Sequence, residues 1–189
     1  SHERTALTTS HQPFADPGNG ESPASSVAHL PGNRQLTVPA SIDMVRLLGP
    51  RDEFLRILER DLAADLHVRG NEITLVGSTT DVALGVDVLT ELITIIRTGQ
   101  GLTVETVERV VAMSLSSDDA RPAEVLTHNI LSTRGKTIRP KTLNQKRYVD
   151  AIDRHTITFG IGPAGTGKTY LAMAKAVQAL QAKQVTRII

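Results

Sequence analysis

The sequence contains no cysteine, so it can form no disulfide and offers no thiolate ligand to a metal ion. Its six histidines are scattered, and none stands at the short spacing that zinc sites favour. No run reaches the roughly 18 consecutive apolar residues of a membrane-spanning helix, and residues 1–34 lack the basic start and apolar middle of a secretory signal. We therefore expect a soluble, cytoplasmic protein. The net charge of +1 favours no class of partner.

A glycine-rich segment, residues 162–169, fits the phosphate-binding pattern G-x-x-x-x-G-K-[ST] at every fixed position. We interpret residues 156–161 before it as a short buried strand and residues 168–183 after it as a helix. Glycines let backbone N–H groups converge on a polyphosphate, and the start of the helix adds partial positive charge. The nucleotide-binding residues predicted for this Walker A loop are Gly162, Pro163, Ala164, Gly165, Thr166, Gly167, Lys168 and Thr169.

Two side chains of the loop carry the expected chemistry. Lys168 is predicted to contact the β- and γ-phosphates of ATP as a mobile cation, and it is the candidate catalytic residue. The Thr169 hydroxyl is predicted to take one Mg²⁺ position, with water, phosphate oxygens and a distal Asp completing the shell. The cofactors expected are therefore ATP and Mg²⁺.

A second glycine pattern overlaps the first. Gly160, Gly162 and Gly165 satisfy G-x-G-x-x-G, which is typical of dinucleotide-binding folds. Such a fold needs an acidic residue about 20 positions later to hold the ribose, and residues 184–189 contain none. We therefore favour the phosphate loop over a dinucleotide site or a merely tight glycine turn.

The chain before the loop divides by composition. Residues 1–34 are rich in Ser, Pro, Gly and Asn and are predicted to form a disordered tail. Residues 35–113 are predicted to form a small α+β module, and residues 114–126 a polar linker. The elements expected in the module are a strand at 44–48, a helix capped by Asp52, a hairpin of 66–69 and 72–76 about Gly70-Asn71, a long helix ending at 99–101, and a helix capped by Thr103.

This order of elements is the plan of the KH domain, which binds single-stranded RNA through a G-x-x-G loop. The corresponding residues, expected directly after the first strand, are Gly49, Pro50, Arg51 and Asp52, so an acid stands in place of the second glycine. Two hypotheses stay open for the KH-like module: RNA binding, or a structural or subunit-contacting role.

Residues 127–189 are predicted to begin a P-loop ATPase domain with a hairpin turning at Arg134-Gly135 and a helix over 143–153. Gln145 has two possible roles there. In a capping box, Thr142 caps the helix and Gln145 reaches back to the Thr142 N–H. Alternatively, the Gln145 amide binds the adenine edge, which presents a matching donor and acceptor.

Basic residues gather in the same stretch, and they could face phosphates or nucleic acid or only form a solvated face. They are Arg134, Lys136, Arg139, Lys141, Lys146 and Arg147.

Five blocks occur along the chain in one order: residues 47–49, 69–71 with the strand that follows, 136–145, 148–152 and 160–169. Together they resemble the bacterial PhoH-like family of ATPases over residues 36–189. The resemblance implies a cytoplasmic ATP-binding protein linked to phosphate starvation, with an ATPase domain similar to that of superfamily 1 helicases. It favours adenine binding by Gln145, because a Gln upstream of the loop has that role in such proteins. Ring-shaped homo-oligomers and an RNA-related role are also implied.

The overall prediction is an α/β P-loop NTPase domain, truncated here, preceded by a small α+β, KH-like module. We expect a fragment that stops at the start of a second strand, before the Walker B Asp, the Glu that orients water and any arginine finger. This chain alone is then expected to be inactive. In full-length form we expect ATP hydrolysis coupled to RNA-related work. The alternatives are a non-catalytic, nucleotide-switched RNA-binding or oligomerisation module, and a GTPase or small-molecule kinase.

Overall fold

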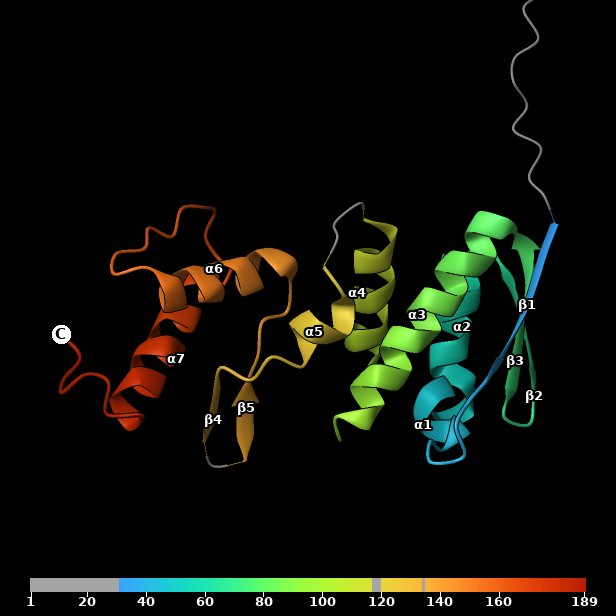
Figure 1. Ribbon diagram of the computed structural model, residues 1–189, viewed down its shortest axis with the longest axis horizontal. Coiled ribbons are helices and arrows are strands. Elements are labelled where there is room, and N and C mark those ends of the chain that lie inside the picture. The colour runs from blue at the N-terminus through green and yellow to red at the C-terminus, as the bar shows by residue number, and fades with distance from the viewer. Residues whose placement is uncertain (1–30, 117–119, 134) are drawn as a thin grey trace, which may run out of the picture.

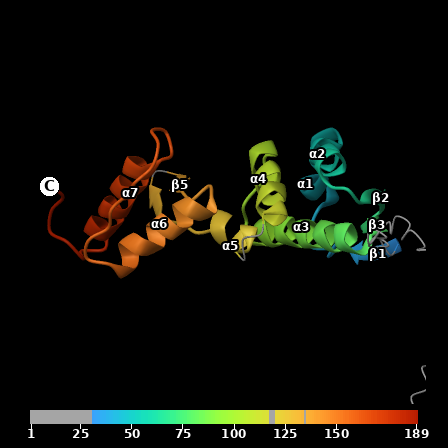
Figure 2. The ribbon, with the colours of Figure 1, turned by 90° about the horizontal axis from the view of Figure 1, so that it is seen from above.

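The computed structural model describes residues 31–116, 120–133 and 135–189. Two hydrophobic cores lie within this part of the chain, and we name the surrounding segments the first unit, residues 31–126, and the second unit, residues 130–189. Both ribbon views place the short helix α5 (Pro122–Leu126) between the sheet of the first unit and the helices of the second (Figure 1, Figure 2).

The first unit contains a three-stranded antiparallel sheet in the order β1, β3, β2. Its strands are β1 (Pro31–Thr37), β2 (Asp65–Arg69) and β3 (Glu72–Ser78). The predicted hairpin is confirmed, because β2 and β3 pair around Gly70, whose φ of 62° suits glycine. Asn71 also contacts the chain just after β1, because its backbone carbonyl accepts a hydrogen bond from the Val38 N–H at 2.8 Å. The hairpin and β1 are thereby held together at one corner of the sheet.

The predicted disordered tail of residues 1–34 is wrong at its end, because residues 31–34 belong to β1. This strand pairs along its whole length with β3, more than 30 residues later in the chain. Such long-range pairing leaves no mark in local composition, so sequence could not reveal it. Residues 1–30 lie outside the described residues.

The strand predicted at 44–48 is also wrong, because these residues form the short helix α1 (Met44–Leu48). Asp43 caps it by accepting from the Val45 N–H at 2.9 Å. Leu47 and Leu48 are adjacent and both buried, which a strand packed on one face cannot achieve. The chain continues through η1 (Pro50–Asp52) to α2 (Glu53–Asp61).

Asp52 precedes α2, but the prediction that it caps this helix is wrong. Its side chain makes no capping hydrogen bond, and its backbone is left-handed with φ of 60°. A capping side chain needs an extended backbone to reach the N–H groups of the first turn.

Two further helices complete the first core: α3 (Thr79–Arg97) and α4 (Val104–Leu115). Helix α3 packs on β1 and β3 and also contacts α4 and α5. The predicted cap of α4 is confirmed, because the Thr103 hydroxyl accepts from the Thr106 N–H at 3.2 Å. Helix α4 contacts α5 and lies at the side of the first unit nearest the second (Figure 1, Figure 2).

The polar linker predicted at 114–126 is wrong at both ends, because α4 extends to Leu115 and the last five residues form α5. Ala123 and Leu126 are buried in the first core. The carboxylate of Glu91 in α3, only 7% exposed, accepts from the Ala123 N–H at 2.8 Å and from Arg121 Nε at 3.1 Å. This buried acceptor satisfies the start of α5, a contact that depends on two elements 30 residues apart.

The second unit contains the predicted hairpin, β4 (Leu131–Thr133) and β5 (Lys136–Ile138), followed by α6 (Leu143–Arg154) and α7 (Lys168–Gln181). Arg134 in the turn lies outside the described residues. The core is small and consists of Ile130, Leu131, Val149, Leu171 and Ala174. Hairpin and helices thus share one core that places the start of α6 near the start of α7.

The strand predicted at 156–161 is absent from the structure, and its apolar side chains face outward. Ile157 is 73% exposed, Phe159 83% and Ile161 95%. A strand needs a neighbour for its N–H and C=O groups, and none lies beside this segment in the described residues. The described chain therefore mixes helices and antiparallel strands without a parallel sheet. None of its described helices combines the length and apolar character needed to cross a membrane.

Candidate functional site

The glycine-rich loop runs directly into the start of α7. Ala164 and Gly165 form an exposed turn, and Gly167 takes the N-cap position with φ of 84°. The Gly167 carbonyl accepts the first helical hydrogen bond, from the Leu171 N–H at 2.9 Å. The free N–H groups at the start of this helix therefore stand beside the loop, as an anion-binding site requires.

Lys168 lies over the loop that precedes it. Its Nζ donates to the carbonyls of Gly162 at 2.8 Å and Pro163 at 2.5 Å and contacts the Thr166 hydroxyl at 3.1 Å. These acceptors are neutral oxygens, so the charged oxygens of a phosphate would be stronger partners for the same ammonium group. Thr169, the next residue, is exposed in the first turn of α7.

Gln145 joins the start of α6 to the loop. Thr142 caps the helix as predicted, since its hydroxyl accepts from the Gln145 N–H at 3.2 Å. The Gln145 Oε1 accepts from the Lys141 N–H at 2.7 Å, so the predicted bond to the Thr142 N–H is wrong by one residue. The Nε2 donates to the Thr166 carbonyl at 3.2 Å. One N–H and one lone pair of the amide are left, so binding of an adenine edge stays a prediction that this geometry allows.

A cavity of about 690 Å³ opens between these elements, within the range that small-molecule sites occupy. Lys168 and Leu171 line it from α7, and Gln145 and Tyr148 line it from α6. The Tyr148 ring packs against Gly160, where a Cβ would meet it at 3.1 Å. The cavity is thus lined by the glycine-rich loop, by the aromatic ring of Tyr148 and by the Gln145 amide, which has one N–H and one lone pair free.

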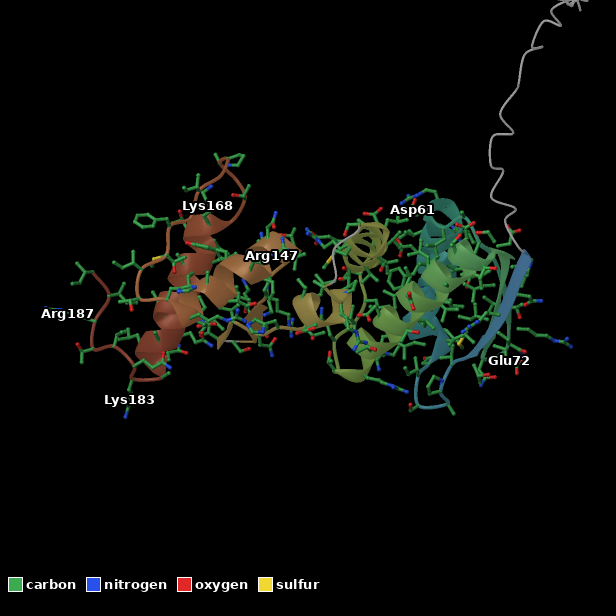
Figure 3. All side chains as sticks on the ribbon, turned by 45° about the horizontal axis from the view of Figure 1, so that its top comes forward. Asp61, Glu72, Arg147, Lys168, Lys183 and Arg187 are labelled. Carbon is green, nitrogen blue, oxygen red and sulfur yellow. The ribbon has the colours of Figure 1, made fainter. Side chains whose placement is uncertain are left out.

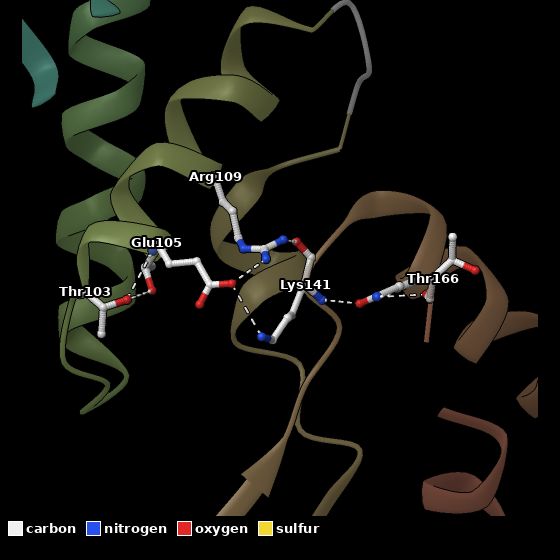
Figure 4. A network of polar contacts seen from close by, with 7 residues as sticks. Thr103, Glu105, Arg109, Lys141 and Thr166 are labelled. Carbon is white, nitrogen blue, oxygen red and sulfur yellow. Dashed lines mark hydrogen bonds and ion pairs between the residues drawn. The ribbon is translucent and has the colours of Figure 1, made fainter. Parts of the chain in front are cut away.

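Arg109, which our sequence analysis did not identify, lines the same cavity from α4 of the first unit. Its Nη1 donates to the Lys141 carbonyl at 2.8 Å, and its Nη2 pairs with Glu105 Oε1 at 2.5 Å (Figure 4). The hydrogen bond from Arg109 lowers the pKa of the Glu105 carboxyl below its ordinary value, and the charges of Arg109 and Lys141 act in the same direction. No sequence pattern links Arg109 to a loop more than 50 residues away.

The basic stretch is not a uniform patch. Lys141 lies 3.4 Å from Glu105, Lys146 pairs with Asp150 at 2.6 Å, and Arg139 donates to Asn129 at 2.7 Å. Arg147 and Lys168 both lie on the second unit in Figure 3, on different helices. Several of these cations therefore have local partners.

The four residues that resemble a G-x-x-G loop lie between α1 and α2, not directly after the first strand. Gly49 has φ of 81°, and a Cβ there would meet the Phe54 ring at 2.8 Å. Arg51 and Asp52 are both left-handed, with φ of 55° and 60°. The loop therefore keeps a glycine-like backbone at Asp52 while presenting a carboxylate.

A PhoH-like protein of Mycobacterium tuberculosis is 67% identical to this chain over 157 residues, which are 80% of the chain and 45% of the relative. The chain belongs to the PhoH-like family. The family model described as PhoH-like protein matches residues 137–189. This family is one of P-loop NTPases, which agrees with the loop and helix described above.

More distant relatives match to a similar extent. A PhoH-like protein of Mycobacterium leprae is 59% identical over 165 residues, which are 87% of this chain and 47% of the relative. One of Bacillus subtilis is 36% identical over 151 residues, 78% of this chain and 46% of the relative. The chain thus spans slightly less than half the length of these relatives. No solved structure matches it significantly.

Proposed function

We propose that this protein binds ATP with Mg²⁺ at residues 162–169 and that the whole protein hydrolyses it. The observation that carries the proposal is the position of Lys168, whose ammonium group lies over the loop carbonyls at the start of α7 and at the edge of the 690 Å³ cavity. Membership of a P-loop NTPase family supports it.

Each part of ATP has a fitting group in this site. The N–H groups at the start of α7 and Lys168 would bind the phosphates, and the Thr169 hydroxyl would hold the metal together with phosphate oxygens and water. Mg²⁺ would neutralise charge on the phosphates. Gln145 keeps one N–H and one lone pair for the adenine edge, and Tyr148 offers an aromatic face in the same cavity.

The test is ATP affinity, measured by titration calorimetry, for the whole protein and its Lys168→Ala variant. We expect affinity to fall about 10- to 100-fold, because a charged hydrogen bond to phosphate contributes roughly 1.5–3 kcal/mol. Lys183→Ala is the control, since Lys183 lies beyond the other end of α7 (Figure 3). Equal affinity of wild type and Lys168→Ala would refute a phosphate-binding role for the loop.

We also propose that the work coupled to ATP involves RNA. The proposal is supported by the first unit, where a strand, two short helices, a hairpin and a long helix follow one another, the sheet is antiparallel, and a four-residue loop beginning with glycine lies between the two short helices. Turnover should then rise when single-stranded RNA is added. If nucleotide instead changes RNA affinity or homo-oligomer size without turnover, the module is a nucleotide-controlled switch. GTP competing as well as ATP would indicate a GTPase.

A further inference from the structure

A continuous path of polar contacts leads from α4 of the first unit to the phosphate loop of the second (Figure 4). It begins with the ion pair of Glu105 and Arg109 and continues from Arg109 to the Lys141 carbonyl. From the Lys141 N–H it passes to the Gln145 side chain, and from there to the Thr166 carbonyl. Every step is 3.2 Å or shorter.

Lys141 is the central residue of this path, because side chains from both units bind its main chain. Arg109 binds its carbonyl, and Gln145 binds its N–H. Its own Nζ lies 3.4 Å from Glu105, the carboxylate that also holds Arg109. From α4, one charged hydrogen bond therefore holds the Lys141 backbone, and one ion pair holds its side chain.

The contacts of Lys141 also decide which way the Gln145 amide points. The amide oxygen must face the Lys141 N–H, and the amide nitrogen must face the Thr166 carbonyl. The opposite orientation would place the amide N–H against the Lys141 N–H and the amide oxygen against the Thr166 oxygen. The remaining N–H and lone pair then have a defined direction. A shift of the Lys141 backbone would change that direction without touching the loop itself.

From this geometry we propose that Arg109 is a positioning residue of the nucleotide site: it holds Lys141 so that the Gln145 amide is oriented for the base. The proposal rests on the ATP site proposed above. Its consequence is that the first unit sets nucleotide affinity through α4, although its core is separate from that of the second unit. A ligand that moved α4 would change ATP binding.

The test is a double-mutant cycle in the whole protein, with Arg109→Ala, Gln145→Ala and the double variant. ATP and inorganic tripolyphosphate are titrated into each by calorimetry. Arg109→Ala should weaken ATP binding up to about 10-fold, the most that loss of the Gln145 contact with the base can cause, while tripolyphosphate affinity changes less than about twofold. In the Gln145→Ala background, Arg109→Ala should have no further effect, because the side chain it positions is gone.

Arg69→Ala, which removes an exposed arginine at the far hairpin, is the matched control and should bind both ligands like wild type. If Arg109→Ala does not fold, Glu105→Gln replaces it, since this change keeps Arg109 and Lys141 in place and removes only the carboxylate charge that both contact. It should then reduce ATP affinity about threefold, again only when Gln145 is present.

The outcomes separate the two proposals. If wild type binds ATP in a Lys168-dependent way but Arg109→Ala or Glu105→Gln binds it equally well, the positioning role is refuted and the ATP site stands. Equal losses with and without Gln145, or equal losses for ATP and tripolyphosphate, also refute it, because they indicate a general structural effect. If wild type binds no nucleotide, both proposals fail.

Discussion

Replacing Gln145 by glutamate tests its amide with almost no change of shape. In Gln145→Glu one carboxylate oxygen still accepts from the Lys141 N–H, but the other faces the Thr166 carbonyl, an acceptor 3.2 Å away. The variant therefore loses the single N–H donor that reaches the loop and the second N–H that the base would use. It keeps the contact that belongs to the start of α6.

The expected effect on stability is small because two contributions oppose each other. Loss of a neutral amide–carbonyl hydrogen bond costs about 1 kcal/mol. A carboxylate in the first turn of α6, which has no acidic residue there now, adds roughly 0.3–1 kcal/mol of stability through the helix dipole. Urea unfolding should therefore give a free energy between about 0 and 0.7 kcal/mol below that of wild type.

ATP binding should respond far more strongly than stability. The lost base contact contributes about 1–1.5 kcal/mol, and a carboxylate near the triphosphate adds repulsion, so affinity should fall roughly 10- to 100-fold. Gln145→Ala should instead lose both hydrogen bonds, about 1–2 kcal/mol of unfolding free energy. Calorimetric titration of ATP and urea unfolding of both variants separate the effect on nucleotide affinity from the effect on stability. A Gln145→Glu variant that binds ATP like wild type would refute a role of the amide in recognition.

Two more predictions follow from single residues. Gly167→Ala should destabilise the protein more than Gly165→Ala in urea unfolding, although both adopt similar left-handed backbones, because only at Gly167 would the new Cβ stand 3.1 Å from Gln145 Nε2. Equal destabilisation would show that Gln145 does not pack there. Burial lowers the pKa of the His128 imidazole below its ordinary value of 6.5, and the charge of Lys146 acts in the same direction. The unfolded chain then binds more protons in acid, so the stability that neutral His128 contributes is present above pH 6.5 and is lost as pH falls through the lowered folded pKa. Unfolding at pH 7.5 and 5.5 should show a larger loss for wild type than for His128→Gln, and equal losses would contradict this assignment.

Features that depend on a few neighbouring residues could be predicted from the sequence. The loop with Lys168 and Thr169, the hairpin at Gly70, and the caps at Thr103 and Thr142 depend on local backbone preference and on hydrogen bonds within four residues. The position of Gln145 in the first turn of α6 could be predicted in the same way. The hydrogen bond from Gln145 to Thr166 could not, because it joins residues 21 positions apart.

Some of the errors arose where a distant neighbour decides the local structure. Residues 31–34 pair with β3, and Glu91 supplies the buried acceptor for the Ala123 N–H at the start of α5. In the opposite sense, residues 156–161 have the composition of a strand but find no partner in the described chain. Pairing supplies hydrogen bonds that apolar composition alone cannot.

The sequence by itself determined the chemistry of the phosphate loop, because glycine backbones, one lysine and a helix start act together within eight residues. Only the tertiary structure brought Arg109 to Lys141 and the Gln145 amide to Thr166. Those contacts join residues 32 and 21 positions apart, so their existence depends on how α4, α6 and α7 pack, and packing is a property of the whole fold.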